Sequence, residues 1–366
     1  MEIICYVFGS LLILVGGLDV FFSVLYARSG TGILAPRVNR IVWHIFRQTA
    51  ILFKNRCDAV LSFCGPVLLV VLIAMWAALL VVGFALIILP QLGEGIQKSS
   101  GTADQGFWTA LYYSGYCFTT LGVGNLTPAT PFWRMLAIFE AAIGFSFFTL
   151  AITYIISVYS ALRRRNTFAL FLHYKTAGTA DPARYLLSLF RHGESSETRV
   201  HLAGITEWLA DLFESHHLYP VLHYFRFREA RYALPRIILI AMESASLSAT
   251  LPKRNGGGGI APSAAVDELW TGGMDVIEHL SENFLSKKFR KPGGEIGKEE
   301  TEQWRRRFFA LAEKMRNVGI EPPSDLNTSA SEYVRLRGQW NHYIVSFCRS
   351  QLFEIDEVVP FNSTNK

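Results

Sequence analysis

Three long apolar stretches dominate the first half of the chain. Residues 3–27 contain a single charged residue, Asp19, residues 67–89 contain none, and residues 135–162 contain only Glu140. An α-helix rises about 1.5 Å per residue, so roughly 20 apolar residues cross the hydrocarbon core of a bilayer. The pattern therefore predicts three membrane-spanning helices.

Beyond residue 163 the apolar positions recur at the spacing of amphipathic helices. Helices are expected over residues 182–189, 196–217, 236–251, 263–289, 298–318 and 329–353. Asp181 and Pro182 are typical of a helix start, and Ser329 with Glu332 forms a capping box at the last helix. Four consecutive glycines predict a flexible linker near 252–262. Strand-like alternation is nearly absent, so the predicted fold class is all-α, with membrane helices followed by an α-helical domain.

Charge is distributed unevenly between the two parts. The 366 residues are 18% charged with a formal net charge of +5, yet residues 1–162 hold 14 charges and residues 163–366 hold 51. The second part has an ordinary soluble composition, for which about 25% charge is typical. The chain therefore divides into 1–57, 58–162 and 163–366. The evenly mixed charges of the last part do not favour nucleic-acid binding. The five cysteines form no CxxC pair, so we expect neither a zinc site nor a disulfide framework.

Basic residues near the ends of the apolar stretches indicate their orientation. Segment 28–58 carries six Lys/Arg residues against one acid, and residues 163–165 are three consecutive arginines. Both clusters should face the cytoplasm of a cell (plasma) membrane, which places the N-terminus outside and residues 163–366 inside. Within the first cluster, residues 34–54 are amphipathic. They fit either a helix lying at anionic lipid headgroups or a connector packed on the cytoplasmic domain.

Between the second and third apolar stretches, a short aromatic run precedes a glycine-containing loop. The run around Trp108 and Tyr112 is about ten residues long, too short to cross a bilayer. A helix that stops part-way into the membrane leaves irregular backbone at depth, which is tolerated only where it lines a watery path or is buried in protein. We therefore predict a re-entrant loop at residues 119–125, Thr-Thr-Leu-Gly-Val-Gly-Asn.

The glycines of this loop suit a row of backbone carbonyls that faces a cation. Stacked rings of oxygen atoms can replace the water shell of a dehydrated ion. Successive carbonyls point the same way only where alternate residues adopt positive φ, and Gly122 and Gly124 occupy alternate positions. Leu121 and Val123 would then point away from the axis into packing, and Thr120 would add its hydroxyl. Because one loop supplies a quarter of each ring, we expect a homotetramer.

This segment resembles the pore region of potassium channels, in which an aromatic-rich pore helix precedes Thr-x-x-Thr-x-Gly-Tyr-Gly-Asp and a proline. The matching residues are Trp108 and Tyr112 of the pore helix, then Thr119, Thr120, Gly122, Gly124 and Pro128. The resemblance covers roughly residues 58–162 and implies an outer helix, a pore helix, a selectivity filter and an inner helix. It also implies that potassium ions bind the carbonyls of Thr120, Leu121, Gly122 and Val123 and the Thr120 hydroxyl. No organic cofactor is evident.

Three positions depart from the potassium-channel pattern. Leu121 replaces the usual Val, Val123 replaces the usual Tyr or Phe, and Asn125 replaces the usual Asp. Val123 lacks the aromatic ring that braces the filter in many family members, and Asn125 lacks the carboxylate that often bonds a pore-helix Trp. Potassium selectivity is the first expectation, and a weakly selective cation channel is the alternative.

The third apolar stretch contains two unusual residues. Gly144 fits either a gating hinge or a close-packing notch, because glycine both bends helices and lets them approach. Glu140, one turn earlier, would either draw cations or hydrogen-bond the pore helix. One face, with Phe148, Thr149 and Ile152, is expected to line the cavity below the filter.

Asp19 in the first stretch also has two interpretations, because it lies within ~14 Å of Arg28 along a helix. It either approaches the cytoplasmic interface or has a role in function. Residues 163–366 contain neither a nucleotide-binding glycine motif nor a catalytic constellation, so we expect no enzymatic activity and identify no ligand for them. The sequence thus predicts a tetrameric potassium channel in the lipid bilayer, gated or assembled by its helical cytoplasmic domain. The alternative from another class is a non-conducting membrane-anchored sensor or scaffold.

Overall fold

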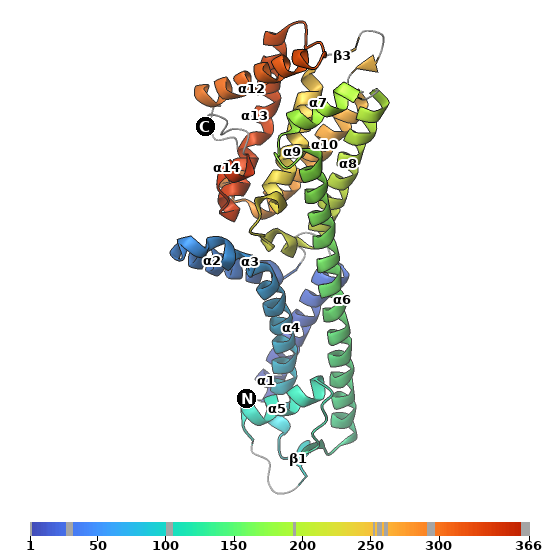
Figure 1. Cartoon of the computed structure of the whole chain (residues 1–366). Coiled ribbons are helices and arrows are strands. Elements are labelled where there is room, and N and C mark those ends of the chain that lie inside the picture. Colours follow the sequence, from blue (N-terminus) through green and yellow to red (C-terminus); the bar gives the residue numbers. More distant parts are fainter. Residues whose placement is uncertain are drawn as a thin grey trace. The chain divides into compact units, whose positions relative to one another are not determined.

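A computed structural model describes residues 2–26, 32–99, 105–192, 195–251, 253–254, 258–259, 263–290 and 297–359. Helices make up nearly all of the regular structure in these residues (Figure 1). The chain forms two compact units. Unit 1 comprises Met1–Gln48, Phe63–Ser160 and Leu218–Tyr224, and unit 2 comprises Thr49–Ser62, Ala161–His217 and Phe225–Lys366.

Among the described residues, three helices are long and apolar enough to cross a membrane, as the hydrophobic pattern predicts. They cover Glu2–Leu25, Cys57–Gln91 and Pro131–Lys175. The first is built from α1 (Glu2–Val20) and one π-helical turn, η1 (Phe21–Leu25). The second contains α3 (Cys57–Ser62), α4 (Cys64–Ile88) and the 3₁₀ turn η3 (Leu89–Gln91). The third is α6 (Pro131–Lys175), which continues past the expected end at residue 162.

Helices α1 and α4 pack closely through glycines. A Cβ atom on Gly9 would lie 2.5 Å from the Gly83 carbonyl oxygen, and one on Gly83 would lie 2.6 Å from Cγ1 of Ile13. Small residues permit such approach where lipid offers no hydrophobic drive for association. The glycines therefore attach the additional N-terminal helix to α4.

The remaining elements of unit 1 are short or amphipathic. Helix α2 (Ala35–Leu52) corresponds to the predicted amphipathic segment, and η4 (Pro220–Tyr224) also belongs to this unit. Between α4 and α6 lie β1 (Ile96–Lys98), α5 (Phe107–Phe118) and β2 (Leu126–Pro128). Strands β1 and β2 pair antiparallel, so they join the chain before α5 to the chain after residues 119–125.

Unit 2 is a helical bundle around α9 (Leu234–Thr250). All residues of α9 except Arg236 and Ala249 are buried, and α7 (Pro182–His192), α10 (Ser263–Phe284) and α13 (Leu326–Gln351) pack against it. Unit 2 also contains α3, the part of α6 after Ser160, and the helices α8 (Ser195–Leu218), α11 (Lys287–Arg290), α12 (Lys298–Asn317) and α14 (Ile355–Val358). Short turns η2 (Lys54–Arg56) and η5 (Ala230–Tyr232) complete it. A two-residue strand pair, β3 (Lys253–Arg254) and β4 (Gly258–Gly259), is described within the predicted 252–262 linker, whose other residues lie outside the described part.

The predicted capping box of the last helix is wrong. Helix α13 begins one turn before Ser329, and its N-cap is Asp325, whose Oδ1 accepts hydrogen bonds from the backbone N–H groups of Asn327 and Thr328, each at 3.0 Å. Glu332 instead pairs with Arg335. An aspartate cap satisfies the free N–H groups equally well, so the helix starts at the earlier cap.

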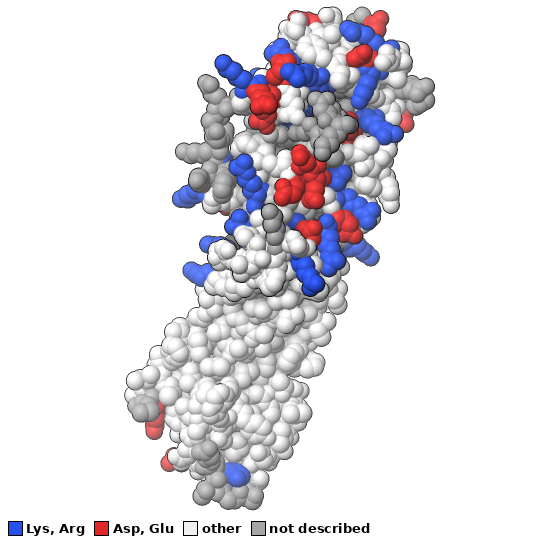
Figure 2. Space-filling model, turned by 60° about the vertical axis from the view of Figure 1, so that its left-hand side comes forward, with Lys and Arg blue, Asp and Glu red and all other residues white. Residues whose placement is uncertain are grey.

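The charge division seen in the sequence reappears on the surface. In Figure 2 the Lys, Arg, Asp and Glu side chains crowd the surface of unit 2, whereas the visible face of unit 1 is almost free of them. An uncharged surface on helices of this length suits contact with lipid hydrocarbon.

Candidate functional site

The candidate site begins with α5, a helix of 12 residues that spans about 18 Å at 1.5 Å per residue. It is followed by residues 119–125, which we call the glycine loop. Thr120, Gly122 and Gly124 have positive φ angles of 57°, 59° and 77°. The positive φ expected at the two glycines is confirmed, and Thr120 extends the alternation by one residue. Alternation of this kind is the backbone condition for carbonyls that share one direction.

Tyr116 holds both ends of the glycine loop. Its backbone carbonyl accepts the Leu121 N–H at 2.9 Å, and its hydroxyl donates to the Leu126 carbonyl at 2.5 Å. At the last residue of the loop, the Asn125 carbonyl accepts the Ser99 N–H at 3.0 Å. The sequence did not single out Tyr116, because nothing in a local pattern shows that its hydroxyl reaches ten residues along the chain.

A single chain leaves this loop uncovered. Every residue from 119 to 125 is exposed, and Leu121 is 72% exposed. The packing expected for Leu121 and Val123 is therefore not supplied by the chain's own described residues. Trp108 and Tyr112 on α5 are also exposed, at 78% and 45%.

Gly144 lies directly against the end of α5. A Cβ atom at Gly144 would lie 1.8 Å from the Phe118 carbonyl oxygen, and helix α6 continues without interruption through this position. The geometry is that of a close-packing notch, and the hinge stays a prediction. On the same helix, the expected cavity-lining residues Phe148, Thr149 and Ile152 are all exposed.

Glu140, one turn before Gly144, is fully buried. Its Oε1 lies 2.5 Å from Oγ of Ser114 on α5, and the same Oγ lies 2.9 Å from the Val81 carbonyl of α4. Of the two interpretations from the sequence, the structure contains the hydrogen bond to the short helix. Ser114 was not predicted, since a serine within an aromatic run gives no signal of its partner.

Asp19 is also fully buried, and its contacts are structural. Its Oδ2 accepts the Trp76 indole N–H at 2.7 Å, and its Oδ1 accepts the Leu34 N–H at 2.7 Å. The Ala35 N–H approaches Oδ2 at 3.2 Å. A carboxylate at this point satisfies the first free N–H groups of α2, so Asp19 joins α1, α4 and the start of α2.

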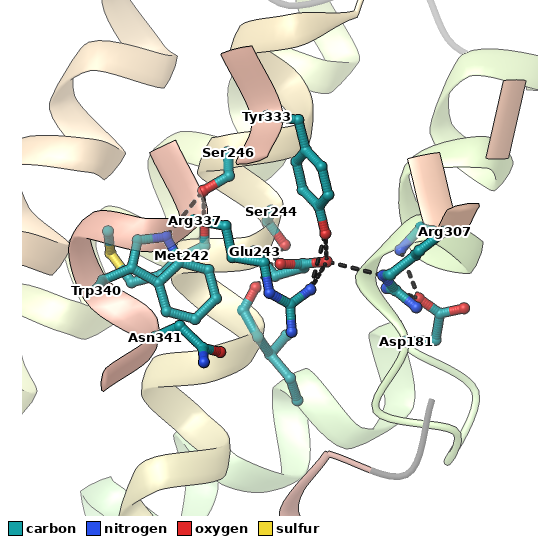
Figure 3. Close-up of polar contacts among 12 residues, drawn as sticks. Asp181, Met242, Glu243, Ser244, Ser246, Arg307, Tyr333, Arg337, Trp340 and Asn341 are labelled. Atoms are coloured by element: carbon teal, nitrogen blue, oxygen red, sulfur yellow. Dashed lines mark hydrogen bonds and ion pairs between the residues drawn. The ribbon is translucent and has the colours of Figure 1, made fainter. Parts of the chain in front are cut away.

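Unit 2 contains a separate buried polar network (Figure 3). Oε1 of Glu243 on α9 accepts hydrogen bonds from Arg307 Nε at 3.0 Å, Arg337 Nη1 at 2.9 Å and the Tyr333 hydroxyl at 2.5 Å. Nη2 of Arg307 also donates to Asp181 Oδ1 at 2.6 Å, just before α7. Two acids balance two arginines, so the network joins α7, α9, α12 and α13 without a net charge.

Aromatic rings enclose this network. The Arg337 guanidinium lies 5.0 Å from the Trp304 ring centroid and 5.5 Å from that of Trp340, within cation–π range. The Trp340 indole donates to Ser246 Oγ at 3.0 Å, as Figure 3 shows. Burial raises the pKa of Tyr333 to about 12, which keeps its hydroxyl protonated as a donor. The arrangement is that of a structural core, and among the described residues no group of His, Cys, Asp and Glu is placed to hold a metal ion.

Comparison with known proteins relates the segment that contains α5 and the glycine loop to a known family. Residues 67–161, which contain most of α4, all of α5, the glycine loop and much of α6, match a family described as ion channel. We call these residues the ion-channel domain, after the family that they match. The chain is also 26% identical over 217 residues to the uncharacterized membrane protein YdjJ of Bacillus subtilis (strain 168).

That match covers 59% of this chain and 61% of the Bacillus protein, so the chain spans less than two thirds of its relative. No solved structure matches. The predicted resemblance to a channel pore is therefore confirmed, and with it the membrane location of the chain. The ion-channel domain ends where the charge-rich part of the sequence begins.

Proposed function

We propose that this chain is one subunit of a homotetrameric potassium channel whose selectivity filter is the glycine loop. The observation that carries the proposal is the alternating positive φ at Thr120, Gly122 and Gly124 within an ion-channel domain. Potassium ions would bind the carbonyls of Thr120, Leu121, Gly122 and Val123 together with the Thr120 hydroxyl. Carbonyl oxygens in such rings replace the hydration shell of the ion.

Exposure of the loop supports assembly of several copies. Irregular backbone is unstable at membrane depth unless protein or water surrounds it. In the single chain the whole glycine loop is exposed, with Leu121 at 72%, and Trp108 on α5 is exposed at 78%. Three further copies around one axis would cover these groups and complete each ring of carbonyls.

Selective flux is the direct test of the proposal. Purified full-length protein in liposomes should carry potassium, and Thr120→Ala or Gly122→Ala should abolish the flux, because Ala at the φ of +59° of Gly122 is strained. Gly17→Ala is the matched control, since a Cβ there meets nothing within 4 Å. Flux that survives both loop substitutions would contradict the proposed filter.

The residue types of the glycine loop support a weakly selective cation channel as a second candidate function. Val123 and Asn125 replace the aromatic and acidic residues of the potassium-channel pattern. Reversal potentials in mixed potassium and sodium solutions separate the two functions, because a selective filter follows the potassium gradient alone. A stable monomer or dimer without flux would instead favour the non-conducting sensor or scaffold.

The amphipathic helix α2 supports the proposed orientation and a contact with anionic lipid at the cytoplasmic face. Its exposed side carries Ile41 and Ile45, exposed by 59% and 57%, beside Arg37, Arg40 and His44. Apolar side chains that enter the headgroup region next to cations are typical of interfacial helices. Protease accessibility of residues 163–366 in sealed, inside-out vesicles tests the orientation.

Control of the channel by the helical domain rests on two connections. Helix α6 is covalently continuous from the ion-channel domain into unit 2. Within unit 2, the Arg226 guanidinium pairs with Asp58 of α3 at 2.6 Å, and α3 leads directly into α4. Unit 2 is thus continuous along the chain with both ends of the pore module.

A further inference from the structure

We infer that Glu140 is a neutral, protonated carboxyl group that positions α5 by a hydrogen bond to Ser114. Ser114 in turn bonds the Val81 carbonyl, so one chain of hydrogen bonds joins α6, α5 and α4. The inference deepens the proposed function, because α5 is the helix that leads into the glycine loop.

The number of hydrogens on the Ser114 hydroxyl determines the protonation state of Glu140. A serine hydroxyl has one hydrogen, and a carbonyl oxygen has none. Ser114 Oγ lies 2.9 Å from the Val81 oxygen, so the serine hydrogen belongs to that contact, and the 2.5 Å contact then needs a hydrogen from Glu140. If Ser114 donated to a carboxylate instead, two oxygens would face each other at 2.9 Å with only lone pairs between them.

The surroundings of Glu140 agree with a neutral group. Glu140 is fully buried, and no Lys or Arg of the described residues forms an ion pair with it. The titratable groups of α5 are Tyr112, Tyr113, Tyr116 and Cys117, and within α4 only Cys64 could titrate. None of these groups can carry a positive charge. A buried carboxylate without a cation is far more costly than a buried acid with a hydrogen bond.

Glu140 and Gly144 contact the end of α5 at two points. They are one turn apart on α6, and their partners Ser114 and Phe118 are one turn apart on α5. The hydrogen bond fixes the rotation of α5, and the glycine notch fixes its distance. Glu140 is therefore a positioning residue that acts on the loop through α5.

Infrared spectroscopy of the purified full-length protein in lipid tests the protonation directly. The wild type minus E140Q difference should contain the C=O band of a protonated carboxylic acid at neutral pH. E94Q is the matched control, because Glu94 is an exposed carboxylate and its loss should remove carboxylate absorption only. S114A should shift the acid band to higher frequency, since the hydrogen bond is lost. A difference spectrum with carboxylate bands alone, or an acid band that S114A leaves in place, would overturn the inference.

Flux provides the second readout. E140Q should conduct like the wild type, because the amide can donate to Ser114, whereas E140A should lower flux about tenfold, because Ser114 Oγ loses the donor that joins it to α6. Loss of flux in a folded E140Q protein would count against the positioning role. The two proposals fail separately: an acid band without potassium flux refutes the channel function alone, and potassium flux without an acid band refutes the Glu140 inference alone.

Discussion

Gly144 illustrates how one residue limits the geometry of the ion-channel domain. Gly144→Ala would place a Cβ atom 1.8 Å from the Phe118 carbonyl oxygen, a backbone atom that cannot rotate away. Overpacking of this kind costs about 1–3 kcal/mol. We expect a lower Tm and reduced flux, measured by thermal unfolding in detergent and by liposome assays. Gly17→Ala, which meets open space, should leave both unchanged. An unchanged Tm with altered gating would favour the hinge interpretation of Gly144.

A single histidine is expected to make unit 2 sensitive to acid. Burial and the charge of Arg165 lower the pKa of His216 to about 3, while its Nδ1–H donates to the Leu212 carbonyl at 2.9 Å. An unfolded chain binds this proton near pH 6.5, so stability is full above pH 6.5 and falls by about 1.4 kcal/mol per unit as the pH drops towards 3.

His216→Leu should remove this contribution. Thermal unfolding of the wild type and the variant between pH 7.5 and 4.5 measures the effect, and the Tm of the variant should fall less steeply below pH 6.5. Parallel slopes for the two proteins would show that another group causes the acid sensitivity.

At the scale of elements, hydrophobic length and spacing predicted the membrane helices and the main bundle helices but not their ends. Helix α6 continues to Lys175 because Arg164 pairs with Asp211 at 3.0 Å and Arg165 donates to the Phe225 carbonyl at 2.8 Å. These partners lie 47 and 60 residues away. Periodicity reports which face of a helix is apolar, whereas a helix end depends on partners that folding brings close.

The same distinction holds in the candidate site. The glycines of residues 119–125 are visible in the sequence because positive φ restricts residue type. Other parts of the site are not visible in the sequence, because each depends on one group of a distant residue. Tyr116 bonds the Leu126 carbonyl, and Ser114 bonds the Glu140 carboxyl. Asp19 bonds the Trp76 indole. Backbone demands are local and predictable, while side-chain partners follow from packing.

The start of α13 offers a direct test at this scale. Hydrogen bonds from Thr328 and Asn327 lower the pKa of Asp325 and satisfy the first N–H groups of the helix. Asp325→Ala should lower the Tm of the protein, because those N–H groups lose their partner. Ser329→Ala, at the position of the predicted capping box, should have little effect in the same thermal unfolding experiment. A larger loss of Tm in Ser329→Ala than in Asp325→Ala would show that the helix is capped by Ser329 and Glu332 instead.

At the scale of the whole molecule, the match to a known family lies in the charge-poor part. The ion-channel match ends at residue 161, and the charge-rich part of the chain begins at 163. In unit 2 a buried network around Glu243 joins four helices, and among the described residues no group of His, Cys, Asp and Glu is placed to hold a metal ion. In the proposed channel, any effect of unit 2 on conduction would pass through its connections to the membrane helices.

Arg226 is the attachment that a substitution can test. Its Nη2 donates to Asp58 at 2.6 Å and to the Leu352 carbonyl at 3.0 Å, its Nε donates to the Gln351 carbonyl at 2.9 Å, and its guanidinium lies 4.1 Å from the Phe353 ring centroid. It thereby ties the segment before α4 to the C-terminal end of α13. Arg226→Gln should change open probability in single-channel recordings several-fold, because the helical domain loses its ion pair with Asp58 of α3.

Unitary current and reversal potential should stay unchanged in this variant, since Arg226 does not touch the glycine loop. Asp58→Asn should shift open probability in the same direction, and the double variant should add little to Arg226→Gln, because both substitutions break the ion pair between Arg226 and Asp58. Arg335→Gln is the matched control: it removes an exposed ion pair with Glu332, which lies far along the chain from α3. Additive effects of Arg226→Gln and Asp58→Asn, or a changed unitary current, would show that the helical domain does not act through this contact.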